Sequence, residues 1–264
     1  MEKILILGGG YGALRYLESL IWDTEKEITI CGFEIQGKSK VLSLEMGLPW
    51  LAFDKLNINI INDFSCIIVA LPPEVKRRCI EKLTEMRYIN ALIIEKPLCI
   101  QEEDLLWYKQ ELPRMERCAV VCQRDYEEYM YYWKDTGSVE ILYPSFNMDD
   151  KFNKWHMLPH ILSLLYTIGG EIPNIKKIKK NYYKGLWCES DISIQFVSHD
   201  VKECLTICGK SFPAVKYREK NILIVDRVMC YSQYETQRNL EKAFAVTQAI
   251  IYLNEEDNKL KYFV

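Results

Sequence analysis

One charged pair in this sequence stands where a binding site can be expected. In "ALIIEKP" (91–97) an apolar run leads straight into Glu95 and Lys96, and Pro97 follows at once. If the run is a strand of a parallel sheet, it delivers Lys96 to the carboxyl edge, where open α/β sheets bind ligands. There the ammonium group could hydrogen-bond a charge that develops on a substrate oxygen, with Glu95 as its anchor and Pro97 fixing the turn through a cis bond. The alternative is a surface lysine paired with Glu95, which would contribute little.

Two histidines could supply a proton donor for the same chemistry. His156 and His160 are four residues apart, so their rings share one face if a helix already covers both. Pro159 is tolerated only in the first turn, which places His156 at or just before the helix start. An imidazole with an ordinary pKa of about 6.5 exchanges protons at neutral pH. A paired catalytic role, plain structural histidines and a metal site stay open, although no H-E-x-x-H pattern supports the metal.

A glycine-rich loop near the N-terminus could hold a pyrophosphate. The segment "LGGGYGALRYL" (7–17) follows an apolar run and opens a helical pattern, with the spacing Gly8-x-Gly10-x-x-Ala13. Gly8 permits a tight turn, Gly10 lets the backbone approach a phosphate, and the helix N-terminus offers free N–H groups and partial positive charge. The expected cofactor loop comprises Gly8, Gly10, Tyr11, Gly12 and Ala13.

Glu34 follows this loop by about 20 residues, at the end of the second expected strand. A carboxylate there accepts the adenosine ribose hydroxyls and repels a 2′-phosphate, which favours NAD over NADP. Lys38, Ser39 and Lys40 come shortly after it and could hold that phosphate instead. The cofactor is therefore expected to be NAD, with NADP open.

The elements that must position these groups alternate between strand and helix over the first 125 residues or so. Strands are expected at 3–9, 27–34, 64–73, 90–97 and 117–125, and helices at 11–23, 37–49, 74–86 and 102–113. This order predicts an α/β fold with a doubly wound parallel sheet, the Rossmann arrangement.

After about residue 130 the pattern predicts an α+β domain with a mostly antiparallel sheet. The expected elements are helices at 156–170 and 236–254 and strands at 175–183, 190–199, 201–209 and 221–229. The run 190–209 is interpreted as a β-hairpin that turns at His199-Asp200, which leaves His199 as a solvated turn residue. Domains are expected at 1–126 and 127–264, with the last helix able to pack back on the first domain.

Composition narrows the class of protein further. The charge of −3 comes from interspersed acidic and basic residues, which gives no support to a nucleic-acid or anionic-membrane partner. No apolar run approaches the roughly 18–20 residues of a membrane span, and the N-terminus does not resemble a signal peptide. The ten cysteines include no C-x-x-C pair, so reduced thiols in a cytoplasmic protein are expected, and no structural metal.

The motifs together resemble the glucose–fructose oxidoreductase / inositol 2-dehydrogenase (Gfo/Idh/MocA-like) family. They occur in the family's order: the glycine fingerprint, "ALPP" (70–73), "EKP" (95–97), "CQRDY" (122–126) and the helix "HMLPHILSLLYTIGG" (156–170). The resemblance implies an NAD(P)-dependent oxidoreductase that transfers a hydride to or from a small polar substrate. A sugar, polyol or sugar nucleotide is the expected substrate class.

The resemblance also assigns roles to residues. Lys96 would contact the nicotinamide ribose and the reacting hydroxyl, and His160 would donate or accept a proton at the substrate oxygen. Leu71 and Pro72 would lie against the nicotinamide-ribose side. The weaker substrate candidates are Arg124 and Tyr126.

Three positions depart from the family pattern. His156 stands where the catalytic helix has an aspartate, Leu71 replaces a threonine, and Lys76 replaces a histidine. The chain is also shorter than is usual in the family, mainly in the second domain. An imine reductase and a non-catalytic dinucleotide sensor therefore remain alternatives. Self-association is one way to cover the far face of the second sheet.

Overall fold

The computed structural model describes residues 1–34, 36–122, 138–198, 205–207, 210–212 and 217–261. It divides into two compact units. The first comprises Met1–Val121 with Lys216–Glu241, and the second Cys122–Val215 with Lys242–Val264. This division differs from a single cut after residue 126, because the chain returns to the first unit over residues 216–241.

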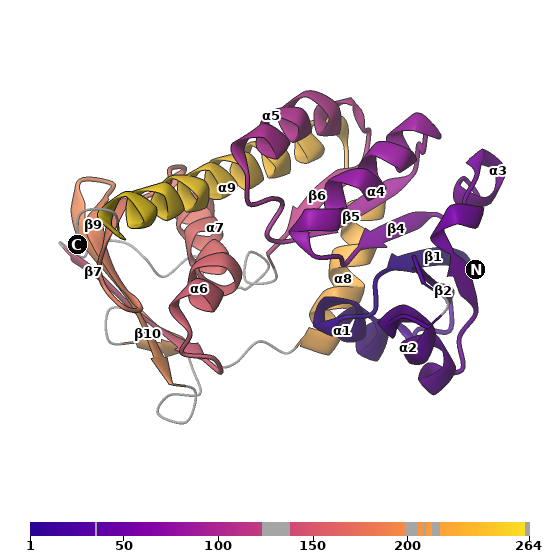
Figure 1. Ribbon diagram of the computed structural model, residues 1–264, viewed down its shortest axis with the longest axis horizontal. Helices are drawn as coiled ribbons and strands as arrows, with labels where there is room; N and C mark the ends of the chain where they lie inside the picture. Colours follow the sequence, from indigo (N-terminus) through magenta and orange to yellow (C-terminus); the bar gives the residue numbers. More distant parts are fainter. Residues whose placement is uncertain (35, 123–137, 199–204, 208–209, 213–216, 262–264) are drawn as a thin grey trace. The chain divides into compact units, whose positions relative to one another are not determined.

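The first unit is built on a six-stranded parallel sheet in the order β3-β2-β1-β4-β5-β6 (Figure 1). Its strands are β1 (Glu2–Leu7), β2 (Lys26–Gly32), β3 (Trp50–Ala52), β4 (Cys66–Val69), β5 (Ala91–Glu95) and β6 (Cys118–Val121). The central strands are continuous apolar runs, buried on both faces as a helix-covered parallel sheet requires. The predicted doubly wound sheet is confirmed. The short edge strand β3 was not predicted.

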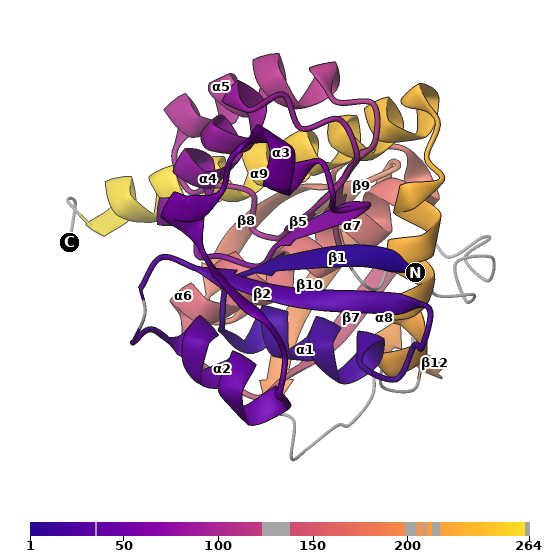
Figure 2. The ribbon, with the colours of Figure 1, turned by 90° about the vertical axis from the view of Figure 1, so that its right-hand side faces the viewer.

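Helices cover both faces of this sheet. They are α1 (Tyr11–Leu20), α2 (Lys38–Met46), α3 (Ile58–Ile61), α4 (Pro73–Glu85) and α5 (Glu102–Glu111). Figure 2 shows α4 and α5 on one face and α1 and α2 on the other. Local signals set their ends: Pro73 occupies the first turn of α4, and Gly47 ends α2 in the left-handed conformation with φ 65°.

The predicted strand at 221–229 is wrong, because this segment lies in helix α8 (Tyr217–Met229). Its buried residues, Asn221, Ile224, Val225 and Val228, follow the i, i+3, i+4, i+7 spacing of a helix face. A short apolar run such as "ILIV" does not by itself distinguish a strand from a buried helix. Contact with α1 and β5 in the first unit decides the outcome.

Helix α9 (Gln233–Lys261) begins along the open edge of β6. The Oδ1 atom of Asn239 accepts a hydrogen bond from the Val120 N–H at 2.8 Å, and Thr236 Oγ1 accepts one from the Cys118 N–H at 3.2 Å. Both N–H groups face outward from the last strand of the sheet. Two side chains of α9 therefore satisfy donors that an edge strand would otherwise expose.

Lys26 links three elements of the first unit at the amino end of the sheet. Its side chain is 4% exposed, and its Nζ lies 2.8 Å from Asp23, 2.7 Å from Asp226 of α8 and 3.4 Å from Glu2 of β1. Burial alone would lower the pKa of Lys26, but Asp226 and Asp23 raise it above its ordinary value. The cluster ties α8 to the starts of β1 and β2.

The second unit contains a six-stranded sheet in the order β12-β11-β7-β10-β9-β8. Its strands are β7 (Ser138–Ser145), β8 (Asn174–Lys179), β9 (Tyr182–Trp187), β10 (Ser190–Ser198), β11 (Leu205–Ile207) and β12 (Lys210–Phe212). All pairs are antiparallel except β7 with β10. The mostly antiparallel sheet is confirmed.

The hairpin predicted for 190–209 is wrong, because β7 lies between β10 and β11. β7 itself was not predicted. Its alternation is clear in the structure, where Val139, Ile141 and Tyr143 point into the core. Pairing between distant segments therefore decided the topology of this sheet, which local patterns do not encode.

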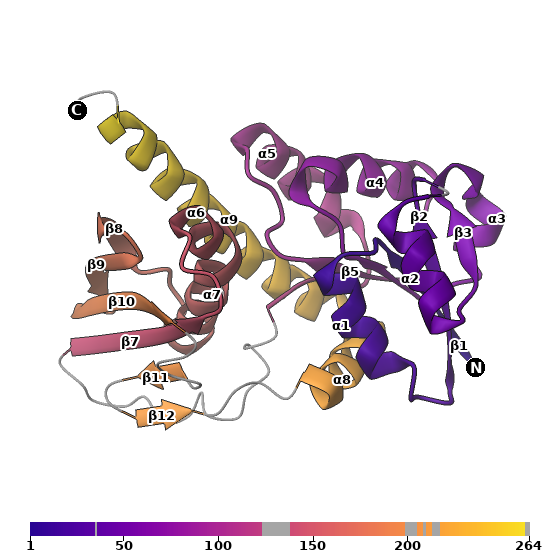
Figure 3. The ribbon, with the colours of Figure 1, turned by 60° about the horizontal axis from the view of Figure 1, so that its bottom comes forward.

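Helices lie on one face of the second sheet (Figure 3). They are the short α6 (Asp150–Phe152), a π-helical segment (Asn153–Met157), α7 (Leu158–Gly169) and the second half of α9. Lys242 of α9 donates a hydrogen bond to Thr167 Oγ1 of α7 at 3.2 Å. No described helix in either unit is long and apolar enough to cross a bilayer. The eight described cysteines are free, and six of them are buried.

Candidate cofactor and catalytic site

The glycine loop presents an open helix N-terminus. Gly10 is the N-cap of α1, with φ −89° and ψ −170°, and no side chain caps the first turn. A Cβ built on Gly10 would meet no atom within 4 Å. A helix N-terminus without a side-chain cap, with open space beside Gly10, suits a phosphate.

Three neighbouring loops meet at this point. A Cβ on Gly8, whose φ is +122°, would lie 2.4 Å from the Ala70 carbonyl oxygen after β4. A Cβ on Gly12 would lie 3.6 Å from Glu95 Cγ at the end of β5. The loops after β1, β4 and β5 therefore pack on one another at the carboxyl edge of the sheet, beside the point where strand order reverses between β1 and β4. Ala13 is fully buried beneath the loop.

Gly9 is a residue of the loop that the sequence reasoning missed. A Cβ at this position would lie 2.2 Å from the Ser39 backbone nitrogen, so the start of α2 packs directly on the loop. The unbroken run of three glycines was the available signal.

The end of β2 carries the expected ribose partner. Glu34 is exposed, and its carbonyl accepts a hydrogen bond from the Gly37 N–H at 3.1 Å. Of the basic segment beyond it, Ser39 is buried and accepts a hydrogen bond from Trp50 Nε1 at 3.3 Å, while Lys40 Nζ lies 5.1 Å from the Trp50 ring centroid. Two of the three residues that could hold a 2′-phosphate thus contact Trp50.

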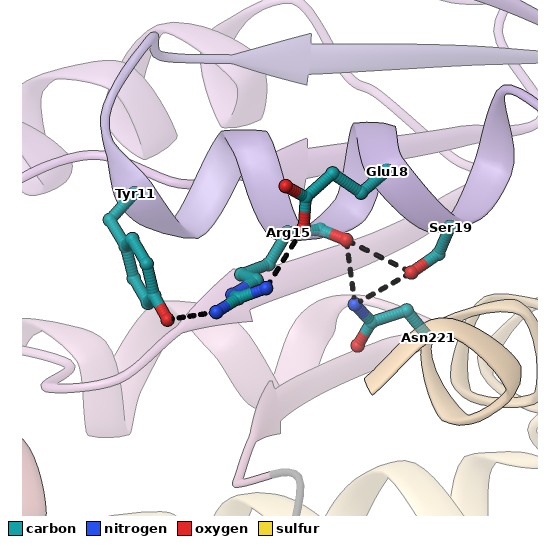
Figure 4. Close-up of polar contacts among 5 residues, drawn as sticks. All are labelled: Tyr11, Arg15, Glu18, Ser19 and Asn221. Atoms are coloured by element: carbon teal, nitrogen blue, oxygen red, sulfur yellow. Dashed lines mark hydrogen bonds and ion pairs between the residues drawn. The ribbon is translucent and has the colours of Figure 1, made fainter. Parts of the chain in front are cut away.

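The side chain of Tyr11 contacts Arg15, one turn further along α1 (Figure 4). Its hydroxyl is hydrogen-bonded to Arg15, whose guanidinium lies 4.7 Å from the Tyr11 ring centroid and pairs with Glu18 at 2.9 Å. Asn221 of α8 donates hydrogen bonds to the Arg15 carbonyl at 2.9 Å and to Ser19 Oγ at 3.2 Å. The first helix is therefore held from its side by α8.

Lys96 follows the last residue of β5 and is half-buried. The peptide bond between Lys96 and Pro97 is cis, as expected. Glu95 is only 7% exposed. In the loop after β4, Leu71 is half-buried and Pro72 is exposed. The predicted residues of the first unit are thus gathered along one edge of the sheet.

Lys76 is the most unusual side chain near this edge. It is fully buried, and its Nζ donates hydrogen bonds to the carbonyl oxygens of Glu95 and Pro97, both at 2.5 Å. Burial lowers the pKa of Lys76 to about 7, although the Glu95 carboxylate acts to raise it. Sequence reasoning noted this residue only as a departure from the family pattern. The signal was its place on the buried face of α4 with Cys79, Ile80 and Leu83.

The two histidines belong to the second unit. His160 lies in the first turn of α7 and is 8% exposed, and Pro159 lies in the same turn, as predicted. The helical run begins earlier than expected, at Asp150. His156 lies in the π-helical segment, half-exposed, with its ring centroid 4.8 Å from that of Phe152. Cys122 is close to the same turn, with its Sγ 3.8 Å from the Pro159 carbonyl oxygen.

A buried polar network fixes the π-helical segment. Asn153 is fully buried, accepts a hydrogen bond from Ser145 Oγ at 2.6 Å and donates one to Asn181 Oδ1 at 3.0 Å. Asp150 accepts from the Asn181 N–H at 2.8 Å and pairs with Lys177 at 2.5 Å. Burial would raise the pKa of Asp150, but Lys177 and the Asn181 N–H lower it below its ordinary value. These contacts therefore connect the segment that carries His156 to Ser145 and to Asn181.

Arg124, Tyr126 and His199 lie outside the described residues. Lys96 and His160 belong to different units, so their convergence on one substrate stays a prediction. Within the described ranges, no three His, Cys, Asp or Glu side chains are grouped to hold a metal ion.

Known structures share this fold at low sequence identity. A Gfo/Idh/MocA family oxidoreductase from Vibrio cholerae superimposes with a TM-score of 0.71 at 8% identity, over 99% of this chain and 100% of that one. Myo-inositol dehydrogenase from Lactobacillus casei, in complex with NAD(H) and myo-inositol, gives 0.70 at 11%, over 98% and 95%. The WlbA dehydrogenase from Chromobacterium violaceum, in complex with NADH and UDP-GlcNAcA, gives 0.66 at 12%, over 97% and 94%.

No protein-family model and no curated protein sequence matches the chain. The chain thus has the fold of the Gfo/Idh/MocA oxidoreductases, which was the resemblance drawn from its motifs.

Proposed function

We propose that this protein is an NAD(P)-dependent oxidoreductase that transfers a hydride to or from a small polar substrate. The observation that carries the proposal is the meeting of three loops at the carboxyl edge of the sheet, where Gly8 packs on Ala70 and Gly12 on Glu95. These contacts support a pyrophosphate at the N-terminus of α1 and a nicotinamide near Lys96. The bound dinucleotide would supply or accept the hydride. The chain itself would orient the cofactor and hold the proton at the substrate oxygen.

In this proposal Lys96 and His160 both act at the substrate oxygen, each with a different role. Lys96 hydrogen-bonds the reacting hydroxyl or carbonyl, and His160 donates or accepts its proton, with His156 as a second imidazole where the family has an aspartate. Glu95 anchors the Lys96 turn. A polyol, sugar or sugar nucleotide is the proposed substrate class. The Lactobacillus enzyme is in complex with myo-inositol and the Chromobacterium enzyme with UDP-GlcNAcA, which supports this class by likeness of fold.

NAD is the proposed cofactor rather than NADP. Glu34 at the end of β2 suits two ribose hydroxyls and disfavours a 2′-phosphate. The contacts of Ser39 and Lys40 with Trp50 support this choice, because they engage two groups that could bind that phosphate. Two of the three solved structures described above are in complex with NAD(H) or NADH.

The test begins with cofactor binding, measured by the fluorescence of NADH and NADPH on titration with protein. NADH should bind about tenfold or more tightly than NADPH, and Glu34→Ala should reduce that ratio. Tighter binding of NADPH would contradict the assignment of Glu34. Failure to bind either dinucleotide would refute the proposed function.

Turnover is then screened with polyols, sugars and sugar nucleotides by following absorbance of the reduced nicotinamide. Lys96→Ala should lower kcat/KM about 100-fold or more, whereas Lys55→Ala, at an exposed site, should leave it unchanged. Binding of NADH without turnover on any substrate, and unaffected by Lys96→Ala, would favour a dinucleotide sensor. Turnover of cyclic imines alone would instead identify an imine reductase.

A further inference from the structure

We propose that Lys76 is a positioning residue for Lys96. Its buried amino group holds the two carbonyls on either side of Lys96 and offsets the negative charge of the Glu95 carboxylate beside the glycine loop. Dinucleotide binding therefore responds to the protonation of Lys76. The inference rests on the proposed function, since Lys96 and the glycine loop are its dinucleotide site.

The geometry of the hydrogen bonds supports the first half of the inference. Lys76 Nζ reaches the carbonyl oxygens of Glu95 and Pro97, and these residues directly flank Lys96. The donor comes from α4, the helix that immediately precedes β5, and the lysine side chain is entirely buried. Both carbonyls are therefore fixed from beneath the sheet edge. A turn held in this way presents the Lys96 side chain from a defined backbone.

The electrostatics of Glu95 support the second half. Glu95 is nearly buried, and its side chain lies against Gly12 in the first turn of α1. A carboxylate at this position would repel a pyrophosphate bound to the same helix N-terminus. A protonated Lys76 balances that negative charge from the other side. Buried lysines lose their charge readily, so this balance can change near neutral pH.

Four titratable groups among the described residues act on Lys76. They are Glu95 and Lys96 at the end of β5, Cys99 in the following loop and Glu74 on α4 itself. Burial raises the pKa of the Cys99 thiol to about 12, so it stays neutral near pH 7. Burial lowers the pKa of Lys76 to about 7. The charge of Lys76 is therefore expected to change near neutral pH.

The sign of the effect follows from these charges. Below its pKa, Lys76 is a cation that favours an anionic dinucleotide. Above it, Lys76 is neutral and no longer adds a positive charge beside the Glu95 carboxylate. The affinity for NADH should therefore fall as pH rises from about 6 to about 8.5, by up to about tenfold if binding raises the pKa of Lys76 by one unit.

The experiment measures the Kd of NADH across this pH range for the wild type and three variants. Lys76→Met and Lys76→Gln should both bind more weakly and show flat profiles, because neither carries a titrating charge. Lys82→Met is the matched control. Lys82 is on the same helix and donates a hydrogen bond to the Phe53 carbonyl at 2.8 Å, away from β5, so its variant should keep the wild-type slope.

Thermal unfolding of each variant separates a structural from a positioning role. A merely structural lysine would change the unfolding temperature and leave the pH profile intact, which would overturn the inference. If Lys76→Met fails to fold, the pH dependence of the NADH Kd for Lys76→Gln and for the wild type still tests the inference. A flat wild-type profile overturns the inference while the proposed function stands. Absence of NADH binding by the wild type at every pH refutes both.

Discussion

At the scale of single residues, close approaches of the backbone determine where glycine is required. Gly9 and Gly10 are neighbours in the glycine loop, but Gly9 is closely packed and Gly10 has open space beside it. A Cβ on Gly9 would lie 2.2 Å from Ser39 N and 2.5 Å from Lys38 C, both backbone atoms that cannot move alone. A Cβ on Gly10 would meet nothing within 4 Å. The two positions therefore separate a role in folding from a role in binding.

We expect Gly9→Ala to lower the free energy of unfolding by about 1–3 kcal/mol, because α2 must shift to relieve the clash. Gly10→Ala should leave stability within about 0.5 kcal/mol of the wild type and weaken NADH binding about tenfold or more, because its methyl group occupies the space that a pyrophosphate needs. Urea denaturation and fluorescence titration measure the two effects. Equal stability of both variants would contradict the close packing of α2 on the loop.

At the scale of elements, α9 completes the sheet of the first unit. Asn239 and Thr236 hydrogen-bond the outward N–H groups of β6, and these donors are buried against the helix. Because these two N–H groups are already hydrogen-bonded, they are not available to pair with a strand of another chain. The start of α9 is therefore part of the first unit, whereas the sequence pattern assigns the last helix to the second domain and allows it to pack back on the first.

Replacement of Asn239 by leucine should lower the free energy of unfolding by about 1–3 kcal/mol, because it leaves the Val120 N–H buried without an acceptor. Gln233→Leu is the control on the same helix. Gln233 donates an exposed hydrogen bond to the Pro113 carbonyl, which water can replace. Urea denaturation of the two variants gives the comparison. If they lose the same stability, the edge bonds contribute no more than a surface contact.

At the scale of the whole molecule, pH acts on the stability of the first unit through the Lys26 cluster. The pKa of Asp23 is lowered by its hydrogen bonds with Lys26 and the Glu25 N–H, so its contribution is present above pH 3.8 and is lost as pH falls through the folded value. The pKa of Lys26 is raised, so its contribution is present below pH 10.5 and is lost as pH rises through the folded value. The cluster therefore stabilises the fold across the neutral range.

Lys26→Met should lower the free energy of unfolding at pH 7 by about 1–3 kcal/mol, since it leaves several carboxylates together without their cation. It should also remove the loss of stability above pH 10.5 that comes from this lysine. Lys3→Met is the control on the adjacent strand, because Lys3 and Asp63 are 3.8 Å apart and largely exposed. Denaturation at several pH values tests both. If Lys26→Met loses stability above pH 10.5 as the wild type does, the role of Lys26 is contradicted.

The sequence by itself determined the doubly wound sheet of the first unit. Apolar runs, a glycine loop and "EKP" are local signals, and each strand of a doubly wound sheet pairs with others by a regular crossover. Gly8, Gly10, Glu95 and Lys96 could therefore be placed at one sheet edge in advance. The place of Pro159 in the first turn of α7 was likewise readable, because proline is tolerated there and disrupts a helix interior.

Only the tertiary structure decided the rest. Helix α8 replaced an expected strand because its apolar stripe packs on the first unit, and β7 separated two strands that are consecutive in sequence. Lys76 is the clearest case. Its sequence position shows a lysine on a helix, but its burial beneath two carbonyls depends on how α4 packs against the end of β5. Local patterns specify elements only where their periodicity is unambiguous, whereas long-range packing decides the ambiguous segments and which groups lose water and so acquire altered chemistry.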